Sequence, residues 1–578
     1  MSVEQLITDN IDIWTSAIKT KSASGRGSSN KLELYGIKKL RELILELAVR
    51  GKLVPQDPTD EPASELLNRS KNVKAELIDS GVLKKSRSKK NIQPERFFEY
   101  PPEWMEASLE DLIHVINGRA YKKNEMLEEG TPILRVGNLF TSNDWYYSDL
   151  ELEPEKYIDD GDLIYAWSAS FGPFIWQGGR VIYHYHIWKM DIFSEECLDK
   201  HFSKIFLQAI SERIKASGSG IAMIHMTKER MEKIVHPLPP IEEQKRIVAK
   251  VDELMALCDQ LESKTKSSIE AHQLLVKTLL ETLTNAKDAD DLNDSWQRIS
   301  EHSDVLFATE DSIDQLKQTI LQLAVMGKLV KQDPNDEPAS KLLERIAAEK
   351  EQLIKDKKIK KQKPLPPIAD DEKPFDLPDG WEWCRLADIA CFENGDRSSK
   401  YPSGSDLVGK GVPFFGAPDI EDGFLAFGSD LRFITKEKFE SLNSGKLRHE
   451  DIVVLLRGSV GKTAMFLKSD EYNTGFINAQ MLIIRAINSN IVSFKKVFFD
   501  SAAYWKQVAD EKSGAVIQQM PASAIAKMLF PLPPLPEQER IVTKVEELIA
   551  LCDALKSKLK MVQKVQLDIS EAFVKQAS

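Results

Sequence analysis

The stretch that decides the fold is HPLPPIEEQKRIVAKVDELMALCDQLE, residues 236–262, because the chain contains it twice. It returns as FPLPPLPEQERIVTKVEELIALCDALK at residues 530–556. A second block, LAVRGKLVPQDPTDEPASELL from Leu47, returns as LAVMGKLVKQDPNDEPASKLL from Leu323. Internal repetition in the same order indicates that one structural unit is used twice. We therefore predict a chain with an internal pseudo-twofold repeat.

The repeated blocks have the pattern of paired helices. Apolar residues recur at steps of four and three, which is typical of a coiled-coil seam, and PLPP followed by acidic residues marks each helix start. Helices with such a narrow seam must pair within the chain or with another subunit, and the segments 40–49 and 316–325 are the predicted partners. The predicted seam residues are Ile247, Val251, Leu254, Cys258 and Leu261 in one copy, and Ile541, Val545, Leu548, Cys552 and Leu555 in the other.

Two segments between the repeated blocks, about 100–240 and 375–534, resemble each other only in outline. Each has short strand-like runs broken by Gly, Pro, Asn and Asp, and each ends in a predicted helix, near 198–216 and 491–512. Nearly identical blocks around two diverged segments, called the inserts below, indicate two recognition units with different targets. A plain tandem duplication without functional asymmetry remains an alternative.

Composition limits the functional classes. A chain of 578 residues with 42% hydrophobic residues can bury several cores, and its five dispersed cysteines favour a reducing compartment over disulfides or structural zinc. No export signal or long apolar run is present, so we expect a cytoplasmic protein that does not enter a membrane. The net charge of -12 offers no general attraction to phosphate, so contacts to nucleic acid must be local.

The stretch RGSVGKT, residues 457–463, suggests a phosphate-binding loop and hence an ATPase. That loop requires a glycine where this chain has Leu456, and it requires a helix to follow. The following TAMFLK is short and β-prone. We predict instead a turn after a strand, with a counterpart in SASFGPF of the first insert.

Three pairs of loops lie at corresponding places in the two inserts and carry groups suited to DNA. Arg and Lys can contact guanine or phosphate, Gln can read adenine, and glycine allows close approach of the backbone. Each residue taken alone could also be an ordinary loop residue. The candidates are Arg119, Tyr121, Lys122, Lys123, Trp167, Ser168, Ser170, Phe171 and His225 in the first insert, and Arg397, Lys400, Tyr401, Arg457, Ser459, Lys462, Gln518 and Gln519 in the second.

The other candidate residues are not predicted to form a functional site. His184 and His186 share one strand face without further metal ligands nearby in the sequence, and Cys258 and Cys552 are interpreted as packing residues. No dinucleotide fingerprint, methyltransferase tetrapeptide or nuclease carboxylate cluster is found, so we expect no catalytic residue and no metal site. The lysine-rich runs at 83–90 and 355–363 are interpreted as solvated linkers, with phosphate contact as the alternative.

Together these motifs resemble the specificity subunit of bacterial type I restriction-modification systems, especially the type IB branch. The paired PLPP starts, the repeated GKLV blocks, RGSVGKT, and YGIKKLRELILELAVRGKLVPQDP at 35–58 carry the resemblance. It implies an α+β fold with two mixed α/β target recognition domains separated by long antiparallel coiled-coil helices. The implied segments are an N-terminal extension and helical segment (1–95), the first recognition domain (96–236), a central helical region and linker (237–370), the second recognition domain (371–530) and a C-terminal helix (531–578).

The resemblance also implies the partners. Each recognition domain is expected to read one half of a split site in double-stranded DNA, while the helices set the spacer and dock two methyltransferase subunits. Restriction and translocase subunits would complete the complex. No cofactor is expected in this chain, since S-adenosylmethionine, ATP and Mg²⁺ belong to those partners. A stand-alone regulator with two DNA-reading domains and a purely structural coiled-coil adaptor remain the competing classes.

Overall fold

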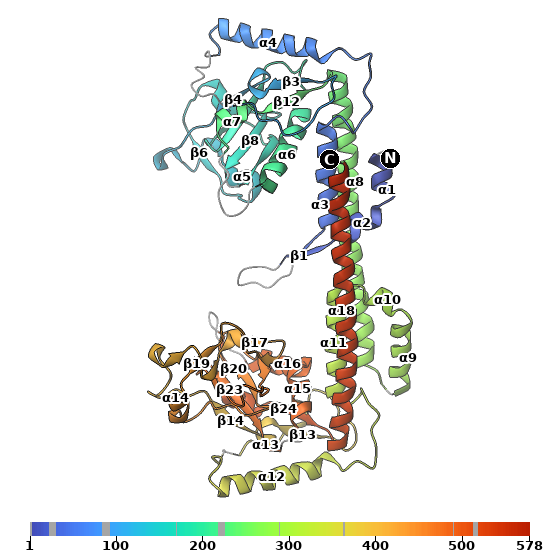
Figure 1. Ribbon diagram of the computed structural model, residues 1–578, viewed down its shortest axis with the longest axis vertical. Helices are drawn as coiled ribbons and strands as arrows, with labels where there is room; N and C mark the ends of the chain where they lie inside the picture. The colour runs from blue at the N-terminus through green and yellow to red at the C-terminus, as the bar shows by residue number, and fades with distance from the viewer. Residues whose placement is uncertain are drawn as a thin grey trace. The chain divides into compact units, whose positions relative to one another are not determined.

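A computed structural model describes residues 3–21, 31–83, 93–168, 170–217, 226–287, 289–361, 364–488, 491–511 and 518–577. The chain divides into two compact units, and the division does not follow the sequence simply. Unit 1 comprises residues 1–269 and 561–578, and unit 2 comprises residues 270–560. The C-terminal end of the chain therefore belongs to the unit that contains the N-terminal end (Figure 1).

Unit 1 contains a mixed domain and a helical part. The domain has one sheet in the order β4-β11-β8-β9, a second in the order β6-β5-β10-β7, and the pair β12-β3. Its strands are β3 (Met105–Ser108), β4 (Ile113–Asn117), β5 (Thr131–Leu134), β6 (Tyr146–Ser148), β7 (Tyr157–Ile158), β8 (Leu163–Ser168), β9 (Ser170–Ile175), β10 (Val181–Tyr183), β11 (Ile187–Ile192) and β12 (Val235–Leu238), with helices α5 (Val136–Phe140), α6 (Lys200–Ser217) and α7 (Lys228–Glu232).

Unit 2 repeats this design. One sheet has the order β14-β23-β20-β21-β18-β17, a second has β15-β19-β16-β22, and β13 pairs with β24. The strands are β13 (Glu382–Arg385), β14 (Ala390–Asn394), β15 (Leu407–Val408), β16 (Val412–Phe415), β17 (Ile420–Glu421), β18 (Phe424–Leu425), β19 (Arg432–Ile434), β20 (Ile452–Leu455), β21 (Thr463–Met465), β22 (Phe476–Ile477), β23 (Met481–Ala486) and β24 (Leu529–Leu532), with helices α13 (Leu386–Ile389), α14 (Lys436–Ser441), α15 (Val492–Asp500), α16 (Ala502–Glu511) and α17 (Ala522–Lys527).

The two domains share one topology. In each, the second sheet contains a single parallel pair, β5 with β10 and β16 with β22; antiparallel strands lie on both sides of the pair in unit 1, whereas β22 is an edge strand in unit 2. The helix predicted after the strands is present in both, as α6 in unit 1 and as α15 and α16 in unit 2, where Ser501 separates the two. The predicted fold class, with two mixed domains and long helices, is confirmed.

The repeated blocks form the predicted helices. The helix α8 (Ile241–Thr284) begins in unit 1 and continues into unit 2, whereas α18 (Leu535–Ala577) begins in unit 2 and ends in unit 1. In unit 1, α8 packs with α3 (Tyr35–Val49), and in unit 2, α18 packs with α11 (Glu310–Val325). The remaining helical elements are α1 (Val3–Thr8), α2 (Ile11–Ser16), α4 (Ala63–Asp79), α9 (Ala289–Glu301), α10 (Ser303–Leu306) and α12 (Ala339–Lys355), and β1 (Lys19–Lys21) pairs with β2 (Lys31–Glu33).

The predicted seam is buried except at its end. Ile247, Val251, Leu254 and Cys258 lie in the core of unit 1 with Leu261 packed against it, and Ile541, Val545 and Cys552 lie in the core of unit 2 with Leu548 packed against it. The prediction was wrong for Leu555, whose side chain is 45% exposed. The repeat equivalent Leu261 stays packed at the same spacing, so the exposure of Leu555 depends on what lies opposite the helix and not on the repeat itself.

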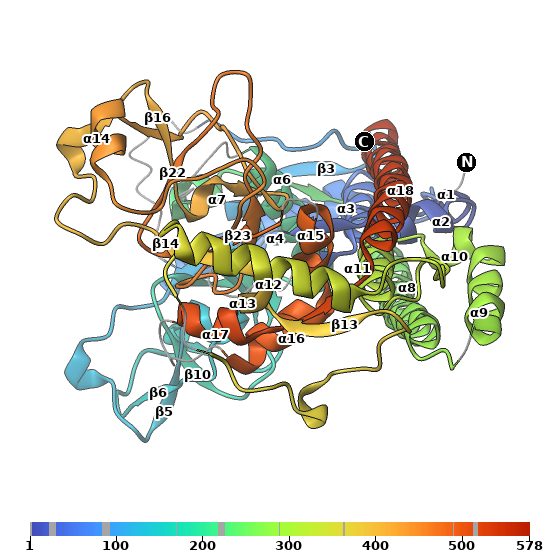
Figure 2. The same cartoon turned by 90° about the horizontal axis from the view of Figure 1, so that it is seen from below.

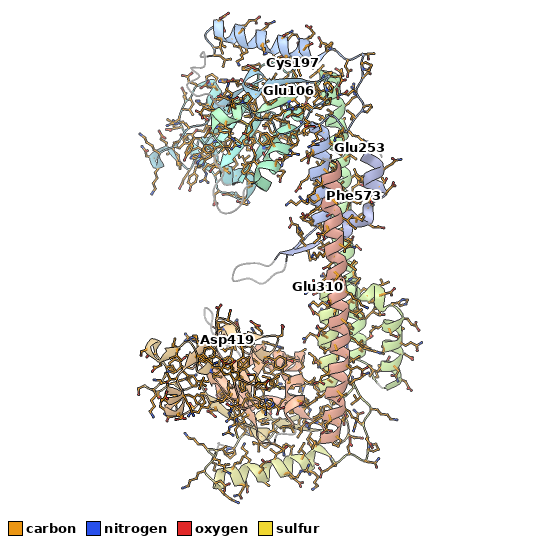
Figure 3. All side chains as sticks on the ribbon, in the orientation of Figure 1. Glu106, Cys197, Glu253, Glu310, Asp419 and Phe573 are labelled. Atoms are coloured by element: carbon orange, nitrogen blue, oxygen red, sulfur yellow. The ribbon has the colours of Figure 1, made fainter. Side chains whose placement is uncertain are left out.

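The C-terminal end of α18 packs against α2 and α3 of unit 1. The Phe573 ring, labelled in Figure 3, lies 5.7 Å from the buried Trp14 ring of α2, and Glu571 accepts a hydrogen bond of 2.5 Å from the Tyr35 hydroxyl of α3. Among the described residues, no helix combines the length and apolar character needed to cross a membrane.

A glycine, called the glycine joint below, follows the last turn of α3 in unit 1 and of α11 in unit 2. Gly51 and Gly327 end α3 and α11 with φ values of 66° and 70°, where a side chain is strained. A Cβ on Gly51 would lie 2.4 Å from Pro101, and a Cβ on Gly327 would lie 2.4 Å from Pro378. The repeated sequence thus fixes the same close contact in both units.

An ion pair repeats beside each joint. Arg246 of α8 contacts Asp60 at 2.6 Å, and Arg540 of α18 contacts Asp336 at 2.6 Å. In unit 2, α12 packs against α13, as Figure 2 shows in the view from below. The two ion pairs hold the start of each long helix against the segment that follows the glycine joint.

Candidate nucleic-acid interface

A three-residue connector joins the two sheets of each domain. In unit 1, residues 184–186 lead from β10 to β11, and in unit 2, residues 478–480 lead from β22 to β23. The two connectors are equivalent, because each follows the parallel pair of one sheet and precedes the second strand of the other. Five of the six predicted loops can be located relative to these connectors, because most of the third loop of unit 1 lies outside the described residues.

The Asn-Gly turns pack directly on the connectors. A Cβ on Gly118 would lie 2.5 Å from the His184 carbonyl oxygen, and a Cβ on Gly395 would lie 2.1 Å from the Asn478 carbonyl oxygen. The Gly118 amide donates to Ile187 and the Gly395 amide donates to Met481, at 3.3 and 3.2 Å. Glycine is required here because only its bare Cα fits so close to another backbone.

The second pair of loops also meets the connectors. The Trp167 amide donates to the His186 carbonyl at 3.1 Å, and the Leu456 amide donates to the Gln480 carbonyl at 2.9 Å. The next residues, Ser168 and Arg457, therefore occupy equivalent positions. In unit 1 the strand pairing extends into this segment, because Ser168 pairs with Ser170 and Trp167 pairs with Phe171 between β8 and β9.

In unit 2 the third loop completes the cluster. Arg457 forms an isolated antiparallel bridge with Gln519, and the Gly458 amide donates to the Gln518 carbonyl at 3.3 Å. The Arg397 Nε donates to the Ala479 carbonyl of the connector at 3.1 Å. Residues from all three predicted loops thus meet around 478–480. The counterpart in unit 1, His225, lies outside the described residues.

The unit 2 cluster presents groups that can read base edges. The exposed residues are Arg397, Lys400, Arg457, Ser459, Gln480, Gln518 and Gln519. Arginine can form two hydrogen bonds to guanine, and glutamine can form two to adenine. Their exposure at loop tips leaves these donors and acceptors able to reach a ligand.

Two candidates in unit 2 have structural contacts. The Lys462 Nζ donates to the Ile420 carbonyl at 3.0 Å, and the Tyr401 ring packs 6.0 Å from the Phe414 ring. The RGSVGKT turn connects the antiparallel strands β20 and β21, and no helix follows it. The rejection of a Walker-type phosphate loop is confirmed by this geometry.

Unit 1 presents an aromatic surface at the equivalent place. Trp167 stacks on Trp188 with 5.6 Å between ring centroids, and its Nε1 donates to the Tyr185 carbonyl at 2.9 Å. Tyr185 is 40% exposed. Aromatic rings of this kind can contact thymine methyl groups or sugar edges, so the two domains differ in chemistry.

The remaining candidates of unit 1 flank this surface. The Arg119 guanidinium contacts Glu125 at 3.0 Å and lies 5.1 Å from the centroid of the largely buried Tyr121 ring. Arg119 also forms an isolated bridge with His184 of the connector. Lys122 and Lys123 are exposed. The turn therefore offers two exposed ammonium groups, while its arginine is paired within the turn.

The histidines of the first connector are close but do not form a metal cluster. The rings of His184 and His186 are 4.8 Å apart. Burial, with smaller contributions from His186 and Arg135, lowers the pKa of His184 to about 4, so this ring is neutral near pH 7. Among the described residues, no group of three or more His, Cys, Asp and Glu could hold a metal ion.

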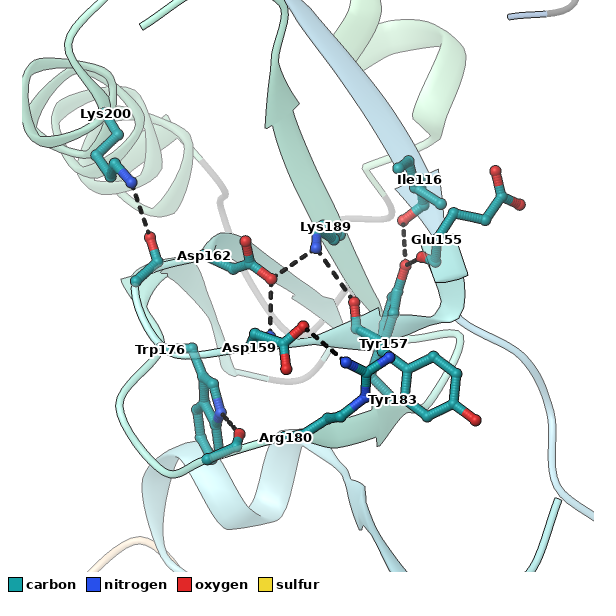
Figure 4. A network of polar contacts seen from close by, with 12 residues as sticks. Ile116, Glu155, Tyr157, Asp159, Asp162, Trp176, Arg180, Tyr183, Lys189 and Lys200 are labelled. Atoms are coloured by element: carbon teal, nitrogen blue, oxygen red, sulfur yellow. Dashed lines mark hydrogen bonds and ion pairs between the residues drawn. The ribbon is translucent and has the colours of Figure 1, made fainter. Parts of the chain in front are cut away.

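A polar network behind the connector fixes strand β10 (Figure 4). The Tyr183 hydroxyl donates to the Glu155 carbonyl at 3.0 Å, and Lys189 Nζ contacts Asp162 at 2.6 Å and the Tyr157 carbonyl at 3.2 Å. Arg180 lies 4.3 Å from the Tyr157 ring centroid. The network links β7, β10 and β11 to the residue that precedes β8, so the connector begins from a strand held on several sides.

Sequence reasoning missed the connectors as contact candidates. Gln480 and Tyr185 are exposed at the centre of the two clusters but lie outside the three loops that the sequence suggested. The missed signal was the Asn-Gly pair, since a glycine in a strand pattern marks close approach of another backbone. Only the fold identifies residues 184–186 and 478–480 as that backbone.

These features define a protein with two copies of a two-sheet recognition domain, each joined to a long helix. The comparisons identify the family: residues 101–271 and 378–563 match the model of the type I restriction modification DNA specificity domain. The chain is 39% identical to the EcoAI specificity subunit and 38% identical to the EcoEI specificity subunit, both type I restriction enzyme subunits of Escherichia coli, with 99% of each chain covered. The chain belongs to this family.

A solved chain from a study of the assembly and conformational transition of a type I R-M system is also similar. Its sequence identity is 18%, the match covers 83% of this chain and 98% of that chain, and the TM-score is 0.48.

Proposed function

We propose that this chain reads the DNA sequence for a type I restriction-modification complex and has no catalytic activity of its own. Each domain reads one half of a bipartite site in double-stranded DNA, and α8 and α18 set the spacer. Two methyltransferase subunits dock on the helices, and restriction subunits that translocate DNA join them. S-adenosylmethionine, ATP and Mg²⁺ act in those partners, in the cytoplasm.

One observation carries this proposal. Both domains bring the same elements of backbone to a connector, yet the side chains differ, with Ser168 in the place of Arg457. A shared framework with different exposed groups is suited to reading two unlike half-sites. Base contacts specify sequence, whereas phosphate contacts mainly position the protein.

The net charge fits a division of labour between subunits. A formal charge of -12 gives the isolated chain little attraction to DNA, so methyltransferase partners would supply most phosphate contacts. We expect the chain alone to bind a cognate duplex much more weakly than its complex with the methyltransferase. Equal affinities would refute this part of the proposal.

Adenine-methylation mapping tests the whole proposal in cells that carry the complete system. The expected motif has two specified halves separated by an unspecified spacer. Exchanging residues 100–236 for those of a relative should change one half only, and a change in both halves would contradict the assignment. Tight operator-like binding without methyltransferase would instead support a stand-alone regulator.

A further inference from the structure

The two helix pairs, α3 with α8 and α11 with α18, have nearly the same apolar faces. The seam of α8 from Ile247 to Cys258 matches that of α18 from Ile541 to Cys552 at every position. Apolar packing alone would let α3 pair with the seam of α18 at 541–552, or α11 with the seam of α8 at 247–258, almost as well as with the native seam. Exchange between duplicated segments is a characteristic failure of repeat proteins.

The charges at the edge of the first pair are arranged with the positive side on α3. Arg41 of α3 contacts Asp259 of α8 at 2.6 Å and Glu262 of α8 at 2.7 Å. Lys38, three residues before Arg41, contacts Glu33 at 3.6 Å. A basic edge of α3 thus meets an acidic edge of α8.

The second pair keeps one of these contacts and reverses the other. Lys317 of α11 contacts Asp553 of α18, which repeats the contact of Arg41 with Asp259. The place of Glu262, however, is taken by Lys556 of α18.

The reversed residue has a reversed partner. Asp314 of α11 stands where α3 has Lys38, and Lys556 Nζ lies 2.6 Å from the Asp314 carboxylate. Lys556 also contacts Glu310 at 3.7 Å, a residue labelled on α11 in Figure 3. The sign of the charge has therefore changed on both helices at this position.

We propose that this double charge reversal is a pairing code that directs α3 to α8 and α11 to α18. The same charges repel the corresponding helix of the other repeat, whether it belongs to the same chain or to a second copy. In a crossed pair of α3 with α18, Lys556 would face Lys38 and Arg41. In the other crossed pair, Glu262 would face Asp314 in place of Lys38, while Lys317 would take the place of its native partner Arg41. Edge charges select partners in coiled coils, and selection requires that wrong pairs be repelled.

Discrimination suits these residues better than stabilisation. Lys556 is 22% exposed and Asp314 is 53% exposed, and ion pairs in such positions add little to stability. The inference concerns helix pairing and goes beyond the proposed function. It does not depend on DNA reading, so either can fail without the other.

The test uses full-length chains in which both repeats carry the same code. The variant Lys38→Asp/Glu262→Lys gives unit 1 the charges of unit 2. The fully exchanged variant adds Asp314→Lys/Lys556→Glu and restores two different codes. Each variant is unfolded and refolded as an equal mixture of two differently tagged preparations, and capture of one tag measures how much of the other is retained.

The same-code variant should retain roughly five times more of the second tag than the parent, since crossed pairs are no longer repelled. The fully exchanged variant should return to the parent level. Equal retention by the parent and the same-code variant would overturn the proposal. If circular dichroism shows that the same-code variant does not fold, Asp314→Lys/Lys556→Glu alone supplies the same comparison in the other direction.

A mismatched variant provides an independent measurement. Glu262→Lys/Lys556→Glu makes both native pairs repulsive and both crossed pairs attractive. It should exceed the same-code variant in exchange between chains. Retention no greater than that of the parent would also overturn the proposal, because the charges would then have no influence on partner choice.

Discussion

Trp104 Nε1 donates a hydrogen bond of 3.1 Å to Glu243 Oε1, and this contact ties the first recognition domain to the first turn of α8. Glu243 is only 1% exposed. Burial, partly offset by the Trp104 hydrogen bond and by Arg246, raises the pKa of Glu243 to about 7. Glu537, its repeat equivalent in α18, is equally buried and its pKa is also raised by burial.

This carboxyl group should make stability depend on pH. The folded protein holds the Glu243 proton more tightly than the unfolded chain, whose pKa is near 4.5. The contribution is therefore complete below about pH 4.5 and is lost as the pH rises through about 7. Glu243→Gln keeps an oxygen acceptor for Trp104 and should stabilise the protein at pH 8, by about 1 to 3 kcal/mol.

Urea unfolding of the parent and of Glu243→Gln at pH 5 and pH 8 checks this prediction. The gain should be much larger at pH 8 than at pH 5. Glu242→Gln, at an exposed neighbouring position, serves as the control and should show no such dependence. A gain of equal size at both pH values would rule out titration of Glu243 as the cause.

Removing Arg457 should weaken recognition of one half-site only. In a complete methyltransferase complex, Arg457→Ala should reduce affinity for the cognate duplex roughly tenfold or more, the effect expected for loss of a bidentate base contact. Binding to duplexes altered singly in each half-site locates the effect. Lys436→Ala, which removes an exposed charge on α14, should leave affinity nearly unchanged. A loss spread equally over unrelated duplexes would indicate a phosphate contact instead.

Tyr185 should contribute to the other half-site. Tyr185→Ala removes the exposed ring of the first connector and should relax the preference for that half-site, whereas Tyr185→Phe should retain most of it if ring contact is the main interaction. The measurement is adenine-methylation mapping with each variant. Relaxation of the half-site that responds to Arg457 would contradict the assignment of one target to each domain.

A methyl group at Gly395 should disturb the second domain. Its Cβ would lie 2.1 Å from the Asn478 carbonyl oxygen, so either the connector or the turn must move. We expect Gly395→Ala to lower the free energy of unfolding by roughly 1–3 kcal/mol. Gly404→Ala provides the matched control, since nothing lies within 4 Å of its added Cβ. Equal stability of the two variants in thermal unfolding would show that the turn can move without a measurable loss of stability.

The repeated helices could be predicted well because their signal is local and occurs twice. The seam from Ile247 to Cys258 follows from spacing alone, and the glycine joint at Gly51 falls where the periodic pattern stops. Leu555 was predicted wrongly because burial depends on which partner lies opposite, and spacing does not contain that information.

The recognition surface could be predicted only in part. Arg457 and Gln519 were both proposed from the sequence, but their adjacency depends on a bridge between segments about sixty residues apart. The sequence indicated a turn after a strand near Ser168, but it did not show that Ser168 and Ser170 pair with each other. The connectors were missed because their importance comes from the joining of two sheets, which no short pattern encodes.

The connectors have a practical consequence for engineering. At residues 184–186 and 478–480 the main chain is anchored by hydrogen bonds from neighbouring backbone, including those from Trp167 and Leu456, so these anchors do not depend on which side chains are present. The three codons of each connector can therefore be replaced together as one cassette. Libraries randomised at one cassette would vary the chemistry offered to the bases while leaving the scaffold that carries it largely intact.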